Sequence, residues 1–117
     1  MTDESRSALD IVTAFGAAWT SKDLDATLAH CTPDFVFEST DPAPDGVRHI
    51  GHEAARQAWK SIFEDPASKF TVEDTIAVDD RVVQLWRFDW GTGHVRGVDV
   101  FRVRDGQVAE KYAYVKG

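Results

Sequence analysis

The sequence predicts one α+β domain, a cone-shaped barrel in which three N-terminal helices pack on a strongly curved, mostly antiparallel sheet and enclose a cavity. The helical stretches all precede residue 65, and four consecutive strands joined by short turns follow. Helices segregated from such a run of strands are typical of α+β domains. One face of these strands carries large aromatic side chains, so the sheet is expected to curve and enclose a space on that face. A length of 117 residues suits a single domain over residues 1–117.

Apolar residues at helical spacing mark the three helices. The first covers residues 6–20. A second, shorter helix begins after Ser21 or Asp23, either of which can cap it, and Pro33 is expected to end it. The third runs from about residue 52 to residue 64. Their apolar stripes are Ala8, Ile11, Val12, Phe15 and Trp19 in the first, Leu24, Leu28 and Cys31 in the second, and Ala55, Ala58, Trp59, Ile62 and Phe63 in the third.

Alternating side chains predict five strands. Residues 34–40 form the first, which places Phe35, Phe37 and Ser39 on one face. The loop 41–46 follows, because it is rich in proline, aspartate and glycine. The other four strands are expected at residues 70–78, 81–90, 94–104 and 107–115, with turns at Asp79-Asp80, Gly91–Gly93 and Asp105-Gly106.

The strand at residues 81–90 indicates what lines the cavity. Trp86, Phe88 and Trp90 share one face, and Arg87 and Asp89 share the other. Burying three aromatic rings stabilises a fold by several kcal/mol, whereas burying an ion pair gives almost no net stabilisation, because the cost of desolvation offsets the attraction. We therefore expect the aromatic set inside and the charged set outside.

Composition excludes several partners. The net charge is −7 and the pI about 4.9, so nucleic acid is not expected to bind. No stretch approaches the ~18 apolar residues of a membrane span, and the first residues do not resemble a signal peptide. We expect a cytoplasmic protein without membrane contact. The single cysteine, Cys31, allows no internal disulfide and is expected to be buried and inert.

No cofactor or metal is expected. No glycine-rich phosphate loop precedes a helix. His49 and His52 are three residues apart, but His30 and His94 are scattered, and a metal site needs three or four ligands at fixed geometry. His49 is instead a candidate hydrogen-bonding group at the mouth of the cavity.

Asp99 is the strongest candidate for a catalytic residue. Alternation places it on one face with Val95, Gly97, Phe101 and Val103. A carboxylate among apolar neighbours is desolvated, which raises its pKa toward the range useful for acid–base catalysis. The alternative is a structural ion pair with a basic residue on the next strand.

Lys111 is that basic residue, and its position depends on register. If Ala109, Lys111, Ala113 and Val115 face inward, Lys111 reaches toward Asp99. If Glu110, Tyr112 and Tyr114 face inward, they line the cavity instead, because a one-residue slip exchanges the two sets.

Other candidates lie near the end of the first strand and in the predicted core. Glu38 is a third candidate catalytic residue, because strand ends beside loops often carry function. The alternative is a solvated carboxylate at the strand edge. The residues expected to touch a ligand are Phe15, Trp19, Phe37, Ser39, His49, Trp59, Phe63, Trp86, Phe88, Trp90 and Phe101.

Several short motifs occur in a recognisable order. Lys22-Asp-Leu-Asp25 follows the first helix, Pro33-Asp-Phe-Val-Phe37 opens the first strand, Gly51 opens the third helix, and Asp105-Gly-Gln-Val108 begins the last strand. Together they resemble SnoaL-like proteins of the nuclear transport factor 2-like superfamily, over essentially the whole chain. The resemblance implies a cystatin-like α+β barrel that encloses a small molecule. It also implies a homodimer formed through the outer face of the sheet.

The superfamily includes steroid isomerases, epoxide hydrolases, polyketide cyclases, dehydratases and binders without catalysis, so the resemblance fixes no reaction. In a comparison with the isomerases, Asp99 takes the place of their protonated aspartate, but Phe15 stands where they have a tyrosine and Ser39 where they have the aspartate base. In a comparison with the epoxide hydrolases, Arg87-Phe-Asp89 resembles part of their aspartate–arginine–aspartate triad, but Ala113 falls near the position of the second aspartate.

Two hypotheses of function follow. The first is an acid–base enzyme, namely an isomerase, cyclase, dehydratase or hydrolase, that acts on a small apolar substrate with Asp99 as its ionisable group. The second is a non-catalytic ligand-binding domain of the same fold. It explains why the catalytic residues of the isomerases and those of the epoxide hydrolases are both incomplete in this chain. An interaction domain is less favoured, because the sequence does not show the exposed apolar patch that it needs.

Overall fold

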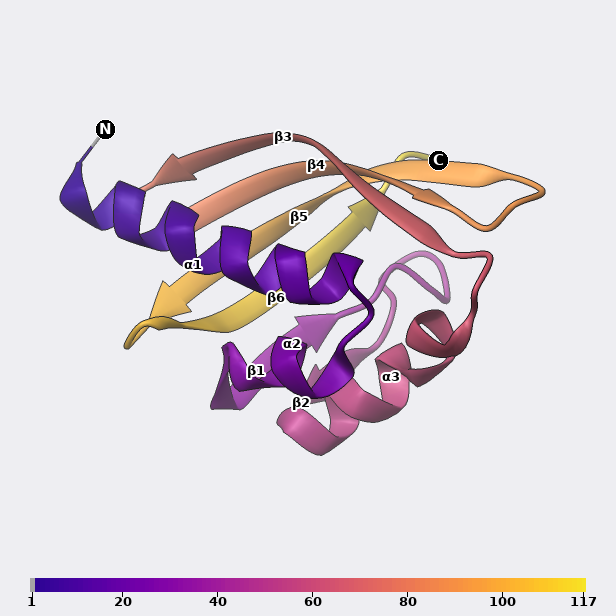
Figure 1. Ribbon diagram of the computed structural model, residues 1–117, viewed down its shortest axis with the longest axis horizontal. Helices are drawn as coiled ribbons and strands as arrows, with labels where there is room; N and C mark the ends of the chain where they lie inside the picture. The colour runs from indigo at the N-terminus through magenta and orange to yellow at the C-terminus, as the bar shows by residue number, and fades with distance from the viewer. Residues whose placement is uncertain (1) are drawn as a thin grey trace.

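The computed structural model describes residues 2–117 as helices packed on a six-stranded curved sheet (Figure 1). The helices are α1 (Asp3–Thr20), α2 (Leu24–Ala29) and α3 (His52–Glu64). The strands are β1 (Cys31–Glu38), β2 (Arg48–Ile50), β3 (Lys69–Val78), β4 (Arg81–Asp89), β5 (His94–Arg104) and β6 (Gln107–Val115). The α+β architecture predicted from the sequence is confirmed, with a sheet that is curved but not closed.

The strand order in the sheet is β2-β1-β6-β5-β4-β3. Every neighbouring pair is antiparallel except β1 and β6, which run parallel. The last strand therefore lies between the first strand and the β3–β5 meander. The helices lie on the concave side, where α1 crosses the meander and α3 covers the end near β1 and β2 (Figure 1).

Side-chain caps begin the first two helices. The Thr2 hydroxyl accepts a hydrogen bond from the Ser5 amide at 3.0 Å, and the Asp23 carboxylate accepts one from the Ala26 amide at 3.0 Å. Ser5 is itself buried, and its hydroxyl accepts a bond from the Asp79 amide at 2.7 Å. This last bond fixes the start of α1 to the turn between β3 and β4.

Three details differ from the prediction. Helix α2 ends at Ala29, so Cys31 opens β1 instead of closing the helix, and Pro33 lies within the strand. The short strand β2 was not predicted, because three residues are too few to show alternation. Trp90 does not face inward with Trp86 and Phe88. Strand β4 ends at Asp89, so alternation no longer sets the direction of Trp90, which is 40% exposed.

The core is a cluster of aromatic rings between helices and sheet. Trp59 of α3 is fully buried at its centre, with ring centroids 4.9 Å from Trp19, 5.1 Å from Phe37 and 5.7 Å from Phe35. Phe15 and Phe101 pack edge-on at 5.6 Å behind this group. Edge-to-face pairs of this kind add to the gain from burial. None of the described helices is long and apolar enough to cross a membrane.

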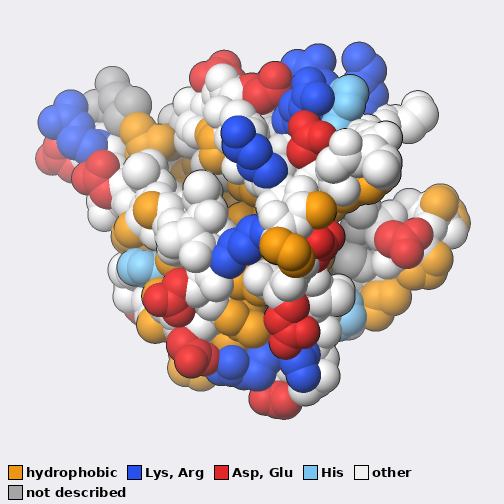
Figure 2. All heavy atoms as spheres, turned by 45° about the vertical axis from the view of Figure 1, so that its right-hand side comes forward, with side chains coloured by type: hydrophobic (Ala, Val, Ile, Leu, Met, Phe, Trp, Pro, Cys, Tyr) orange, Lys and Arg blue, Asp and Glu red, His pale blue; other side chains and the backbone are white. Residues whose placement is uncertain are grey.

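The outer surface is mixed in charge. Figure 2 shows acidic and basic side chains interspersed with hydrophobic ones on one face of the molecule. Several ion pairs lie on this surface, among them Arg96–Glu73 at 2.9 Å and Arg56–Asp25 at 2.8 Å. Exposed pairs of this kind contribute little to stability.

Gly97 permits the close approach of Trp86 to the sheet. A Cβ atom at Gly97 would lie 2.7 Å from Cζ2 of Trp86 and 2.2 Å from the carbonyl oxygen of Tyr114. Neither group has room to retreat, because Trp86 is buried and the carbonyl belongs to the neighbouring strand. A glycine is therefore required here by space.

We expect Gly97→Ala to lower the free energy of unfolding by about 1–3 kcal/mol, because overpacking forces the ring or the strand to move. Gly16→Ala is the matched control. Nothing lies within 4 Å of a Cβ at Gly16 in α1, and alanine there should raise stability by ~0.5–1 kcal/mol. Urea denaturation measures both. Equal stabilities for the two variants would contradict this account.

Candidate functional site

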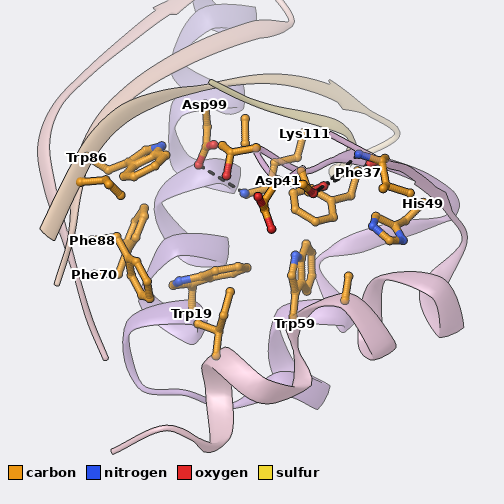
Figure 3. A pocket seen from close by; sticks show the side chains of 17 residues that line it. Trp19, Phe37, Asp41, His49, Trp59, Phe70, Trp86, Phe88, Asp99 and Lys111 are labelled. Atoms are coloured by element: carbon orange, nitrogen blue, oxygen red, sulfur yellow. Dashed lines mark hydrogen bonds and ion pairs between the residues drawn. The ribbon is translucent and has the colours of Figure 1, made fainter. Parts of the chain in front are cut away.

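A cavity of about 440 Å³ lies between the helices and the concave face of the sheet (Figure 3). Its walls are mostly apolar, and its polar groups are few. The lining residues are Trp19, Phe37, Ser39, Thr40, Asp41, Val47, His49, Ala58, Trp59, Ile62, Phe70, Trp86, Phe88, Val95, Asp99, Lys111 and Ala113. This size and composition are typical of a pocket for a small molecule.

The register of β5 and β6 brings Asp99 and Lys111 to the same face of the sheet. Asp99 lies opposite Ala113, and Lys111, two residues before Ala113 on β6, lies opposite Phe101. Of the two registers left open by the sequence, the structure has the one with Ala109, Lys111 and Ala113 inward. Nζ of Lys111 is 3.4 Å from Oδ2 of Asp99, and both side chains are almost completely buried.

Three aromatic rings surround the Lys111 ammonium group. Nζ lies 4.8 Å from the centroid of Phe37, 4.9 Å from that of Trp19 and 5.9 Å from that of Trp59. Aromatic faces carry partial negative charge and attract a cation at such distances. The rings come from β1, α1 and α3, so helices and sheet together build this cage around the end of Lys111.

Burial controls the ionisation of Asp99. Removal of its carboxyl group from water raises its pKa, and the Lys111 charge and a polar contact from Trp86 oppose that rise without reversing it. Oδ1 of Asp99 and Nε1 of Trp86 are both buried without a hydrogen-bond partner. The indole N–H faces the carboxylate but does not reach hydrogen-bond geometry (Figure 3). Oδ1 thus keeps a free site for a proton or a polar group.

Seven of the residues predicted to touch a ligand line the cavity: Trp19, Phe37, Ser39, His49, Trp59, Trp86 and Phe88. His49 stacks on Phe37 at 5.6 Å between centroids. The remaining four do not line it. Phe15 and Phe101 pack in the core behind the wall, Phe63 lines a separate small pocket, and Trp90 lies outside.

Glu38 does not join Asp99 and Lys111. It alternates with Phe37 on β1, so its side chain points to the outer face. There its carboxylate accepts a hydrogen bond from Nε of Arg48 on β2 at 2.9 Å. Glu38 is thus a partly buried partner of Arg48 at the end of β1, away from the cavity. Arg87 and Asp89 also lie on the outer face, paired with each other at 3.0 Å. With Ala113 inside, no arginine–aspartate triad of the epoxide hydrolase kind is assembled.

Asp41 was missed from the sequence. It lies in the loop after β1, and its carboxylate points into the cavity (Figure 3). The loop is closed at its base, because the Val47 amide donates to the Ser39 hydroxyl at 3.0 Å and the Ser39 amide donates to the Val47 carbonyl at 3.1 Å. The only sequence signal was the position of Asp41 in a loop that follows a strand. Phe70 was also missed, although alternation along β3 places it opposite Phe88.

Cys31 is fully buried, and its thiol contacts the Thr27 carbonyl at 3.5 Å. Burial raises its pKa to about 12, so it stays a thiol at neutral pH. Among the described residues 2–117, no three His, Cys, Asp or Glu side chains are grouped as metal ligands.

A curved sheet with helices on its concave face, and between them a mostly apolar cavity that holds the Asp99–Lys111 pair, defines the class: a cone-shaped α+β protein with a pocket on the concave side of its sheet. The SnoaL-like domain model matches residues 12–111, and the chain therefore belongs to the SnoaL-like domain family. No match is found among curated proteins.

Solved structures agree with this assignment. An NTF2-like protein of unknown function from Mesorhizobium loti is 36% identical, with a TM-score of 0.91, over 100% of this chain and 97% of that one. A Kribbella flavida protein with the provisional name ketosteroid isomerase is 15% identical (TM-score 0.84; 97% and 81% covered). An LEH-like epoxide hydrolase of M. tuberculosis is 20% identical (TM-score 0.76; 97% and 85% covered). The last two show the shared fold alone.

The raised pKa of Asp99 predicts how stability depends on pH. Between the ordinary carboxyl value of 3.8 and the raised value, the unfolded chain releases a proton that the folded chain retains. The stability contributed by protonated Asp99 is therefore full below 3.8 and is lost as the pH rises through the raised value. We expect the free energy of unfolding of the wild type, minus that of Asp99→Asn, to fall across this window.

Urea titrations at a series of pH values measure that difference. Asp89→Asn, which removes an exposed carboxylate from the outer face, is the control for the change in net charge. A difference that rises with pH would show that Asp99 is stabilised in its ionised form, contrary to this account.

Proposed function

We propose that this protein is an acid–base catalyst that transfers a proton on a small, mostly apolar substrate held in the cavity. The observation that carries the proposal is the Asp99 carboxyl group, which is buried at the cavity wall with Oδ1 unpaired and Oδ2 3.4 Å from Lys111. A carboxyl group with a raised pKa is suited to take up and return a proton near neutral pH. Isomerisation, cyclisation, dehydration and hydrolysis all use such a step.

The walls support the choice of substrate class. Six aromatic side chains line the cavity, and polar groups gather at Asp99–Lys111 and around Asp41 and His49. Such a site suits a molecule of roughly 10–20 heavy atoms with one or two polar ends. Names of distant relatives, an isomerase, a cyclase and an epoxide hydrolase, fit proton-transfer chemistry in general and select none of these reactions.

The proposal can be tested without the natural substrate. The ring of 5-nitrobenzisoxazole opens after a base removes one C–H proton, and the coloured product reports the rate. We expect Asp99→Asn to lower this rate by about 10²–10⁴-fold, because the amide cannot accept the proton. Asp89→Asn is the matched control and should retain the wild-type rate, since Asp89 is on the outer face.

Quenching of tryptophan fluorescence by the same probe measures binding separately. Equal binding by the wild type and Asp99→Asn, with a large difference in rate, supports the proposal. Equal rates would refute it, and binding without catalysis would favour the ligand-binding alternative.

We also propose that a second copy of this chain covers the outer face of the sheet. Two rows of apolar residues cross this face. One runs from β3 to β6 through Ile76, Val83, Val100 and Tyr112, and the other runs from β4 to β6 through Leu85, Val98 and Tyr114. The ion pairs Arg96–Glu73 and Arg102–Glu110 flank these rows and already satisfy each other within the chain. Most of this face is therefore apolar or already paired within the chain, although Asp74 and Arg81 are exposed at its edge, and such a surface suits its own copy.

We expect sedimentation at micromolar concentration to give twice the chain mass of 13.0 kDa. Tyr114→Glu should shift the protein to the monomer, because it places a charge within the apolar rows on a side chain that is 57% exposed. Ile50→Glu, at a side chain that is 64% exposed but on edge strand β2, should not. A monomeric wild type would contradict the proposal.

A further inference from the structure

Lys111 brings a primary amine into the cavity. Among the described residues it is the only lysine that lines it. Lys60, Lys69 and Lys116 are exposed, and Lys22 donates to the Asp65 carbonyl. A buried amine in an apolar site is a suitable nucleophile whenever it is not protonated, as Schiff-base-forming lysines illustrate. Proton transfer alone does not require an amine at this place.

The surroundings of Nζ favour the product of such a reaction. When an amine condenses with an aldehyde or ketone, the protonated imine keeps a positive charge at the same nitrogen. The three rings at 4.8–5.9 Å from Nζ would stabilise that cation as they stabilise the ammonium group. A largely apolar cavity also disfavours the reverse reaction, because hydrolysis of the imine needs water.

Asp99 is placed to move the protons that this reaction requires. Its Oδ2 is 3.4 Å from Nζ, so a proton transferred to the carboxylate leaves a free electron pair on nitrogen. The same carboxyl group can then return the proton to the oxygen that leaves as water. A raised pKa makes the protonated state accessible near neutral pH.

We propose that Lys111 captures an apolar aldehyde or ketone in the cavity as an imine, with Asp99 as the proton carrier. The nitrogen electron pair forms a bond to the carbonyl carbon, and the C=O π electrons move to oxygen, which takes the proton that the nitrogen loses after the addition. The resulting carbinolamine loses one water molecule, with Asp99 protonating the leaving hydroxyl, and C=N forms. One amine and one carbonyl compound give one imine and one water, without oxidation or reduction.

This inference goes beyond the proposed function, because the covalent bond forms whether or not the site turns a substrate over. The probe is 2-naphthaldehyde, an apolar aldehyde within the size range of the cavity. Sodium cyanoborohydride is added at neutral pH to reduce any imine to a stable secondary amine. Peptide mass mapping then measures the rate of naphthylmethyl addition at each lysine. Cys31 does not compete, since it is buried and its pKa is raised to about 12.

We expect Lys111 to be labelled on the order of tenfold or more faster than exposed Lys60, because the cavity holds the aldehyde beside Nζ. The alcohol 2-naphthalenemethanol, which fills the cavity but cannot condense, should protect Lys111 and leave Lys60 unaffected. Lys111→Arg keeps the positive charge and removes the primary amine, and should abolish only the fast labelling. Asp99→Asn should slow labelling at Lys111, whereas Asp89→Asn should not.

Labelling of Lys111 at or below the rate of Lys60, or labelling that the alcohol does not reduce, would overturn the proposal. Both readings come from the wild-type protein and do not depend on the folding of any variant. A wild type that opens 5-nitrobenzisoxazole but shows no fast labelling would refute imine formation and leave acid–base catalysis standing. Fast labelling without ring opening would support imine formation and refute acid–base catalysis.

Discussion

The burial of one ammonium group constrains this structure more than any other interaction. Removal of an ion from water costs several kcal/mol even after relaxation, and the cost must be offset locally. For Lys111 the offset comes from Asp99 at 3.4 Å and from the faces of Phe37, Trp19 and Trp59. Each ring contributes up to about 2 kcal/mol when the cation is desolvated. The rings belong to three different elements, so the charge also fixes how β1, α1 and α3 approach β6.

The same arrangement sets the ionisation of Asp99. Burial raises the pKa of its carboxyl group, and the charge of Lys111 at 3.4 Å opposes that rise. A ligand that donates to the unpaired Oδ1 shifts that balance without touching Lys111. The state of the pair therefore depends on what occupies the cavity as well as on pH. The second acidic group there, Asp41, lies on a loop and is exposed to solvent.

Much of this could be predicted from local patterns. The helices follow from apolar spacing, and alternation along β5 was sufficient to place Asp99 on the inner face with Phe101. The inward face of β6 could not be predicted, because either of its sets alternates equally well. The structure explains the choice: small Ala109 and Ala113 flank Lys111 and leave room for the large rings of the helices. Side chains of Tyr112 and Tyr114 would fill that space.

The aromatic cage was beyond sequence reasoning for a different reason. Its rings are at positions 19, 37 and 59, and nothing local relates them to position 111. Each was expected in the core, but their convergence on one nitrogen depends on the relative placement of four elements. Trp90 illustrates a different difficulty, the exact end of a strand. Its predicted inward direction assumed that β4 continues through residue 90, and it was wrong because β4 ends at Asp89.

The parallel pairing of β1 with β6 has a consequence for synthesis of the protein. Phe37 pairs with Lys111, so one ring of the cage and the lysine that it surrounds are neighbours in the sheet yet far apart along the chain. A ribosome makes the chain from its N-terminus, and until residues 107–115 emerge, β1 and the β3–β5 meander have no strand between them. During that interval the edges of β1 and β5 that will pair with β6 are open, and the closing of such a distant contact is slow. The nascent chain is therefore most exposed to misassociation just before its cavity can form.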